Sequence, residues 1–469
     1  MGREGACGRR AVSLLPTNSL RRQRDHASSG RGSHRSIAAA GCHQPWNEMT
    51  GGESGELSPS SVGGPTSASL LPLATEAFLK VRAPAFIHVN LDAVAHNVHV
   101  LKRLSGPNTG IMGVVKGGAY GSGLMQVVTV LLEEGVQELA VATVAEGVHL
   151  RQQGVHVPIT ILSNLLTCEL QDVTQHRLIP SVSWAKTLAS VPSDSLVYPD
   201  GSRLRVAINI DTGMSRYGVQ PEDLPQLVST LDELNVTINS MYTHFQAAFT
   251  EKEKNQTQLN IFLQATEPYK DRPLVRHVAA TTGCVQGLGT HLDLIRPGGA
   301  ITGLSSGSDR DGVHLFAKCG FRPAMSVVVK PAFFKLLPPG RFIGYDATYQ
   351  TSCDEWIANF TTGWSDGLSR RLSNGVGAVK RVKTGELCPI VGRVSMDSIT
   401  ARLPEAPGDD EVFQVMTDDF HEVTSAVGMA RNLGAAVYEI PGKWSTRLAR
   451  VYSRNGKIAH ICHSFQYTC

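Results

Sequence analysis

From residue 84 onward, the hydrophobic positions of the chain alternate between two periods. Short apolar runs such as Gly110–Lys116 have the length of buried strands, and stretches such as Leu91–Leu104 repeat apolar residues at the spacing of one helix face. Buried strands separated by amphipathic helices favour parallel pairing with helical crossovers. About eight such repeats over residues 84–320 predict an α/β fold, a (β/α)8 TIM-like barrel; a doubly wound open sheet is the alternative. The expected strands are Ala85–Asn90, Gly110–Lys116, Leu139–Thr143, Pro158–Ser163, Leu178–Ser183, Leu204–Ile210, Val236–His244, Val275–Ala279 and Leu292–Gly303.

After about Gly320 the helical period stops. Short β-rich segments separated by Pro and Gly turns take its place, which predicts a second, mostly-β domain over residues 321–469. One helix, Val423–Leu433, interrupts it. The expected strands of this domain are Met325–Leu336, Glu355–Thr362, Leu387–Val391, Ser398–Leu403 and Glu411–Met416.

Residues 1–80 are rich in Arg, Ser and Gly and are expected to lie outside the core, as a disordered or targeting leader. An Arg- and Ser-rich, acid-poor composition is typical of an organelle transit peptide. A disordered tail, or a leader upstream of a start at Met49, is the alternative. We therefore expect an intracellular protein, cytoplasmic unless this leader directs it to a mitochondrion or plastid.

Charge and composition exclude several classes of protein. Eight of the 44 basic residues but only two of the 41 acidic ones fall in the first 40 positions, so the remainder is slightly acidic and has no basic footprint for nucleic acid. No stretch reaches the roughly 18–20 uninterrupted apolar residues of a membrane helix. The nine cysteines show no CxxC pair or Cys/His ligand spacing, so no metal site is indicated.

Two glycine-rich segments follow expected barrel strands, where the chemistry of such barrels lies. Lys116 ends one strand and precedes Gly117–Gly123; alone it would be a solvated rim lysine, but glycines let a ligand approach the backbone closely. The second segment, 296–299, is Arg-Pro-Gly-Gly. It is either a simple turn or a site where backbone N–H groups face a phosphate.

Several motifs resemble those of the alanine racemase family. Residues 114–123, VVKGGAYGSG, resemble the cofactor-attachment signature VVKANAYGHG, and residues 209–218, NIDTGMSRYG, resemble KIDTGMxRLG. Residues 243–245 and 296–298 match further blocks. In the second domain, GYDATY at 344–349, GWSDG at 363–367 and PIVGRVSMD at 389–397 resemble GYGxTY, GYADG and PIVGRVxMD. The blocks follow the order of the family from about residue 84 to 453.

The resemblance implies a pyridoxal 5'-phosphate (PLP) enzyme that interconverts L- and D-alanine with two bases. Lys116 would hold the cofactor as a Schiff base and serve the D-enantiomer, and Tyr345 would serve the L-enantiomer. A tyrosine titrates near ~10, so it needs cationic neighbours or hydrogen-bond donors, which the resemblance assigns to His244 and Arg296. Arg296 would also face the pyridine nitrogen and leave it unprotonated, which weakens the electron sink and favours proton return.

The remaining roles also come from the resemblance. Arg216 and Met396 would lie near the substrate carboxylate of a small amino acid. Tyr345 would enter from the second domain of a partner subunit, which implies a homodimer with shared active sites. The cofactor phosphate would be contacted by Tyr120, Thr281, Gly298 and Gly299.

The chain departs from the family pattern at several positions. Asn209 stands where the family has a lysine or similar residue, so a carbamylated lysine is excluded there. Thr446 replaces a tyrosine that contacts the phosphate and narrows the substrate entrance, so we expect weaker anchoring and a wider entrance that admits serine. The other departures are Ala280-Thr281 for Asn-Ser, which keeps a hydroxyl, and Thr302 and Trp364 for tyrosines.

Four alternatives stay open at this stage. A serine or broad-specificity racemase would share the whole plan. A PLP-dependent decarboxylase on the same plan would normally have an acidic group at the position of Arg296. A barrel-only PLP carrier would lack residues 321–469. A degenerate pseudo-enzyme would bind the cofactor without turning over.

Overall fold

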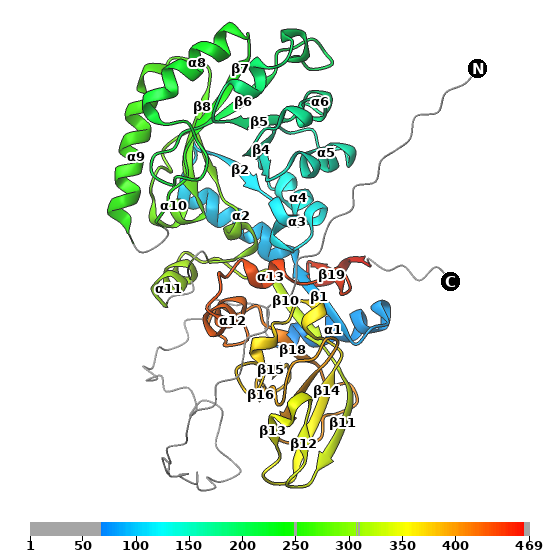
Figure 1. The fold of residues 1–469 in the computed structure, drawn as a ribbon. Helices are drawn as coiled ribbons and strands as arrows, with labels where there is room; N and C mark the ends of the chain where they lie inside the picture. Colours follow the sequence, from blue (N-terminus) through cyan, green and yellow to red (C-terminus); the bar gives the residue numbers. More distant parts are fainter. Residues whose placement is uncertain (1–66, 248–250, 306, 308–309, 464–469) are drawn as a thin grey trace, which may run out of the picture. The chain divides into compact units, whose positions relative to one another are not determined.

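The computed structural model describes residues 67–247, 251–305, 307 and 310–463. Eight strands, β2 to β9, pair in parallel and close a barrel, with helices between them along the chain (Figure 1). The expected (β/α)8 barrel is confirmed. The strands are β2 (Gly110–Val114), β3 (Glu138–Val141), β4 (Ile159–Asn164), β5 (Ile179–Val182), β6 (Arg205–Asn209), β7 (Thr237–Tyr242), β8 (Val275–Ala280) and β9 (Leu294–Arg296). The principal helices are α2 (Leu91–Ser105), α4 (Leu124–Glu133), α5 (Val144–Gln152), α6 (Leu170–Gln175), α7 (Lys186–Ala189), α8 (Leu224–Glu233), α9 (Lys252–Thr266) and α10 (Thr281–Gln286).

The first expected barrel strand lies elsewhere. β1 (Ala85–Asn90) pairs antiparallel with β10 (Met325–Val329) and parallel with β19 (Ala449–Arg454), so it belongs to a sheet of the second domain. Its assignment to the barrel was wrong. All but one of its residues are buried, and an apolar strand covered on both faces has the same pattern in a barrel as in a sheet.

The second domain is mostly β, as expected. A seven-stranded sheet has the order β16-β15-β18-β10-β1-β19-β20, and a three-stranded sheet has the order β11-β14-β17. The periodicity missed the strands β15 (Ala378–Arg381), β19 and β20 (Lys457–Cys462). The other elements are α11 (Arg310–Lys318), β11 (Pro331–Leu337), β12 (Phe342–Ile343), β13 (Tyr349–Gln350), β14 (Glu355–Phe360), β16 (Leu387–Pro389), β17 (Ile399–Leu403), β18 (Phe413–Met416), α12 (Ala426–Leu433) and α13 (Glu439–Gly442).

The last residues of the expected leader are part of the core. Helix α1 (Ser67–Val81) buries Leu70, Ala74 and Phe78, which form a cluster with Phe86 of β1. These positions are four residues apart and lie on one helix face, so the helical period was present in the sequence and was overlooked. The expectation that residues 67–80 lie outside the core was therefore wrong. The leader and transit-peptide predictions for residues 1–66 fall outside the described residues.

Within the described part of the chain, no helix combines the length and apolar character needed to cross a membrane. The same residues contain no cluster of three or more His, Cys, Asp or Glu side chains arranged to hold a metal ion.

Candidate active site

Lys116 follows β2 at the C-terminal end of the barrel, at the start of the short helical turn α3 (Lys116–Tyr120). Gly117 and Gly118 have φ of 62° and 61°, a left-handed conformation that glycine adopts without strain. The N–H of Gly117 donates to Oε1 of Glu146 at 2.6 Å. Glu146 also closes the N-terminal capping box of α5, so the loop after Lys116 is fastened to the neighbouring βα unit.

The environment of Lys116 favours its neutral amine. Its pKa is lowered, first by burial and then by the charges of Arg216 and Arg296, while Glu146 acts in the opposite direction. A lowered pKa increases the fraction of unprotonated amine, which is the form that acts as a nucleophile or a base. The structure therefore excludes a freely solvated rim lysine.

Arg296, at the end of β9, lies in the interior of the barrel mouth with 3% of its surface exposed. Its guanidinium donates to the carbonyl groups of Thr243 and, at 3.2 Å, Val278, and it lies 4.9 Å from the ring centroid of Tyr242. Burial lowers the pKa of Arg296 to about 10, so it stays protonated at neutral pH. Its buried Nε has no hydrogen-bond partner among the described residues, which leaves one donor for a bound group.

His244 lies among the same charges. Its pKa is lowered to about 3, first by burial and then by Arg296, Arg216 and Lys116. These four side chains therefore gather at one barrel mouth, as expected. A neutral His244 can donate or accept a hydrogen bond but carries no charge there.

His277 of β8 was not singled out from the sequence. It is fully buried and its ring stacks on Tyr242 at a centroid distance of 5.2 Å. Tyr242 in turn bonds Ser181 at 2.8 Å. Burial, with the nearby Arg296 charge, lowers the pKa of His277 well below its ordinary value. A single buried histidine in a strand has no sequence signal that separates it from a structural one.

Gly298 and Gly299 form a cradle with aromatic and hydroxyl side chains. The Tyr120 hydroxyl fills the space that a Cβ on Gly298 would need, and the Tyr438 ring does the same for Gly299. The Thr281 hydroxyl accepts the N–H of Gly298 at 3.3 Å and of Ala300 at 3.2 Å. Hydroxyl groups around glycine backbone at the end of a late barrel strand suit a phosphate. The expected phosphate contacts are thus brought together.

Tyr438 changes the interpretation of Thr446. The rings of Tyr438 and Tyr120 lie 5.5 Å apart, so a C-terminal tyrosine is present at the cradle. Thr446 lies exposed in the turn that follows α13. The exposed position of Thr446 in this subunit gives no support to the expected weakening of the cradle, so that expectation stays a prediction to be tested by mutation.

The loop that carries Arg216 is fixed by its own side chains. Oδ1 of Asp211 accepts the N–H of Gly213 at 3.0 Å and of Ser215 at 2.9 Å, and Thr212 bonds Thr243 at 2.8 Å. Asn209, at the end of β6, is buried.

Tyr345 and Met396 lie apart from this group, on the second domain. Tyr345 is 67% exposed at the start of a short turn, where Asp346 pairs with Arg393 at 2.6 Å. Met396 is 50% exposed. No hydrogen bond, ion pair or ring contact among the described residues joins Tyr345 to the barrel mouth. Within one subunit, the two expected bases are therefore not brought together.

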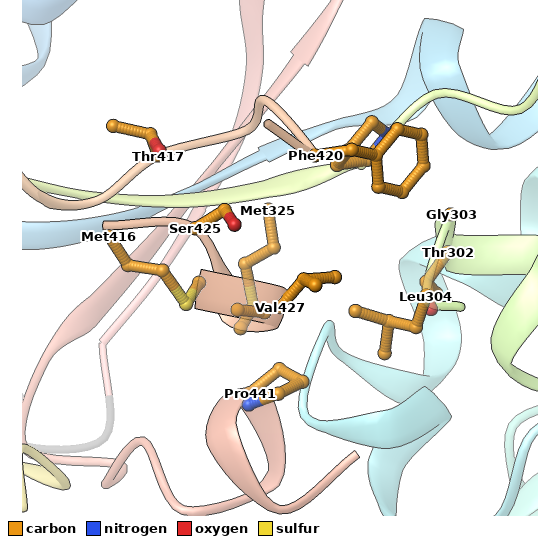
Figure 2. A pocket seen from close by; sticks show the side chains of 12 residues that line it. Thr302, Gly303, Leu304, Met325, Met416, Thr417, Phe420, Ser425, Val427 and Pro441 are labelled. Atoms are coloured by element: carbon orange, nitrogen blue, oxygen red, sulfur yellow. The ribbon is translucent and has the colours of Figure 1, made fainter. Parts of the chain in front are cut away.

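A small cavity lies behind the cradle, between the turn after Gly299 and α12. Figure 2 shows Leu304, Val427 and Pro441 around it, with Thr302 at its edge. Thr302, which replaces a family tyrosine, bonds the carbonyl of Gly299 at 3.3 Å. The lining is mainly apolar and contains no charged side chain, so this cavity does not suit a phosphate or an amino acid.

The sequence and the structure of this chain are similar to those of alanine racemases. Residues 89–306 match the model of the alanine racemase N-terminal domain, and residues 324–452 match that of the C-terminal domain. The chain is 31% identical over 389 residues to alanine racemase 1 of Caldanaerobacter subterraneus, covering 81% of this chain and 97% of that protein. It is 32% identical over 383 residues to the alanine racemase of Halothermothrix orenii, covering 80% and 98%. The crystal structure of alanine racemase from Bacillus anthracis with bound L-Ala-P superimposes with a TM-score of 0.73 at 29% identity, covering 81% and 98%.

Proposed function

Because this chain belongs to the alanine racemase family, we propose that it interconverts L- and D-alanine with PLP as its cofactor. The observation that carries the proposal is the position of Lys116. Its amine has a lowered pKa and shares the barrel mouth with Arg216, His244 and Arg296.

The residues present fit the cofactor. The cradle of Tyr120, Thr281, Gly298 and Gly299 would hold the phosphate, and Lys116 Nζ would bond the aldehyde carbon. The buried, unpartnered Nε of Arg296 would donate to the pyridine nitrogen. PLP, when bound, supplies an electron sink for the electron pair left by the departing α-proton.

Arg296 limits that sink. Its pKa of about 10 keeps the guanidinium protonated at neutral pH, so it would donate a hydrogen bond to the ring nitrogen without transferring its proton. An unprotonated ring nitrogen withdraws electrons more weakly. The arrangement favours return of the proton to the α-carbon over side reactions such as transamination, and it disfavours a decarboxylase, which would have an acidic group there.

Racemisation requires proton access to both faces of the α-carbon. Lys116 Nζ would hold and move the proton on one face, for the D-enantiomer. Tyr345 of the partner subunit would do so with its hydroxyl on the other face, for the L-enantiomer. Arg216 would bind the substrate carboxylate, with Met396 of the partner subunit beside it.

Exposed apolar side chains support a homodimer. Leu166, Trp184 and Tyr217 are exposed in loops after β4, β5 and β6, on the rim of the barrel mouth. A second exposed group lies on the C-terminal domain and consists of Phe342, Tyr345, Trp364 and Met396. Large exposed apolar groups mark interaction surfaces. In a two-fold symmetric dimer, the second domain of each subunit would lie over the barrel mouth of the other. Both exposed groups would then be buried in each subunit.

Alanine is favoured over serine because the similar proteins are alanine racemases. Tyr438 also places an aromatic ring beside Tyr120 and Gly299, which gives the cradle a tyrosine of the second domain.

The test combines cofactor binding with proton exchange. Wild type should show the visible absorbance band of lysine-bound PLP and should incorporate deuterium from solvent at the α-carbon of both alanine enantiomers. Lys116→Ala should lose both, and Lys186→Ala, an exposed lysine, should lose neither. Cofactor binding without exchange would indicate a carrier or pseudo-enzyme, and release of CO2 would indicate a decarboxylase.

A further inference from the structure

Three segments of the second domain meet at one guanidinium group, that of Arg447. They are residues 363–367, 395–398 and 444–447, and we call them the latch. We propose that Arg447 is a positioning residue that fixes the latch so that Met396 is presented to the substrate site of the partner subunit. This inference rests on the proposed racemase function and its shared active sites.

Arg447 contacts the other two segments directly. Its Nη1 donates to Oδ1 of Asp397 at 2.8 Å and to the hydroxyl of Ser365. Its Nε lies 3.4 Å from Oδ1 of Asp366. One side chain thus connects the two segments that overlap family-like motifs of the second domain.

Ser365 links Arg447 to Met396 through hydrogen bonds. Its hydroxyl donates to the main-chain carbonyl of Met396 at 2.8 Å, and its own N–H donates to the same oxygen at 3.0 Å. The N–H of Trp364 donates to the carbonyl of Ser395 at 3.0 Å. A side chain on Gly363 would overlap the carbonyl groups of Ser395 and Met396, so the two loops lie in close contact.

The charges of Asp366 and Asp397 favour an arginine at this position. The hydrogen bond from Arg447 lowers the pKa of Asp397. Burial raises the pKa of Asp366, while the N–H of Gly363 and the charge of Arg447 act in the opposite direction. The Asp366 side chain is only 3% exposed. Without Arg447, two neighbouring carboxylates would repel each other and one would be nearly buried without its cation.

The latch leaves Met396 available to a partner. It uses the main-chain carbonyl of Met396, while the residue stays 50% exposed. Arg447 also follows Tyr438 closely in sequence, and Tyr438 lies at the cofactor cradle of its own subunit. The segment 438–447 therefore begins at one proposed active site and ends at the surface offered to the other.

The experiment compares Arg447→Met with Arg447→Lys, Ser365→Ala and a control, Arg272→Met. Arg272 forms a comparable ion pair with Asp232 at 2.7 Å, away from the latch. In Arg447→Met dimers, we expect KM for both alanine enantiomers to rise roughly 10-fold with a smaller change in kcat, because positioning errors weaken substrate binding. The Kd for PLP should stay unchanged, because Arg447 contacts Ser365, Asp366 and Asp397 rather than the cradle residues. Amide hydrogen exchange in 363–367 and 395–398 should accelerate, also without PLP.

Arg447→Lys should have a KM between those of wild type and Arg447→Met. Ser365→Ala should raise KM above the wild-type value. Arg272→Met should leave KM and amide exchange in the latch unchanged. An unchanged KM and unchanged amide exchange in Arg447→Met and Ser365→Ala would overturn the inference while leaving the racemase intact. Should Arg447→Met fail to fold, the KM and exchange of the other two variants decide. A wild type that does not exchange the α-proton would overturn the proposed function instead.

Discussion

The hydroxyl of Tyr120 occupies the space into which a side chain on Gly298 would project. These residues lie on different barrel units, one after β2 and one after β9, so the contact closes the seam between the first and last strands at their C-terminal ends. The cradle depends on a glycine here because tyrosine and Cβ cannot both fit.

Gly298→Ala should therefore weaken PLP binding. The added methyl displaces Tyr120, and overpacking of this kind costs about 1–3 kcal/mol, which corresponds to a roughly 5- to 150-fold increase in the Kd for PLP. Spectroscopic titration of the apoprotein measures it. Gly408→Ala serves as the control, because a Cβ there meets nothing within 4 Å. Equal affinity for wild type and Gly298→Ala would contradict the cradle assignment.

Helix α1 should contribute to stability through one face only. Phe78 is buried and contacts Phe86 edge-on at a centroid distance of 4.9 Å, whereas its neighbour Leu79 is 75% exposed. Phe78→Ala should lower the free energy of unfolding by about 3–5 kcal/mol, and Leu79→Ala by less than about 0.5 kcal/mol. Urea unfolding compares the two, and similar losses would mean that α1 is not packed as described.

His88 should make the fold sensitive to acid. It is buried beside Ser453 at 2.9 Å, and burial lowers its pKa to about 4 from 6.5. Between these values the unfolded chain binds a proton that the folded chain does not, so stability falls as the pH decreases from 6.5 to about 4. Across this whole pH range, the free energy of unfolding should fall by roughly 3 kcal/mol because of His88.

The measurement is the free energy of unfolding as a function of pH. His88→Gln should lose less stability across this window than wild type, and the exposed His149→Gln should follow wild type. Parallel curves for wild type and His88→Gln would refute the assignment.

Thr446 and Tyr438 should behave differently on mutation. Thr446→Tyr should leave the ratio of kcat/KM for alanine and serine unchanged, because Thr446 lies in an exposed turn. Tyr438→Ala should raise the Kd for PLP roughly 10-fold, because the cradle loses the ring that packs on Tyr120 and Gly299. A changed ratio of kcat/KM for alanine and serine in Thr446→Tyr would show instead that Thr446 lies at the substrate entrance.

Much of this architecture could be predicted from the sequence, because the barrel strands and the motifs at their ends are local. The errors arose where an assignment depended on distant partners. β1 has a buried pattern that fits either a barrel or a sheet, and only its pairing with β10 and β19 decides. The role of Tyr438 depends on contact with Tyr120, far away in sequence. Arg447 has no recognisable spacing from Ser365 or Asp397, so its network could come only from the structure.

The most direct test of the central claim mixes subunits of Lys116→Ala with subunits of Tyr345→Phe. If each active site combines Lys116 of one subunit with Tyr345 of the other, a hybrid dimer has one intact site. Random reassociation of the inactive parents should then restore about a quarter of wild-type racemisation, since half of the dimers are hybrids with one working site each. If Lys116 and Tyr345 act within one subunit, every site in the mixture carries a defect. No recovery in verified hybrid dimers would contradict the shared two-base site.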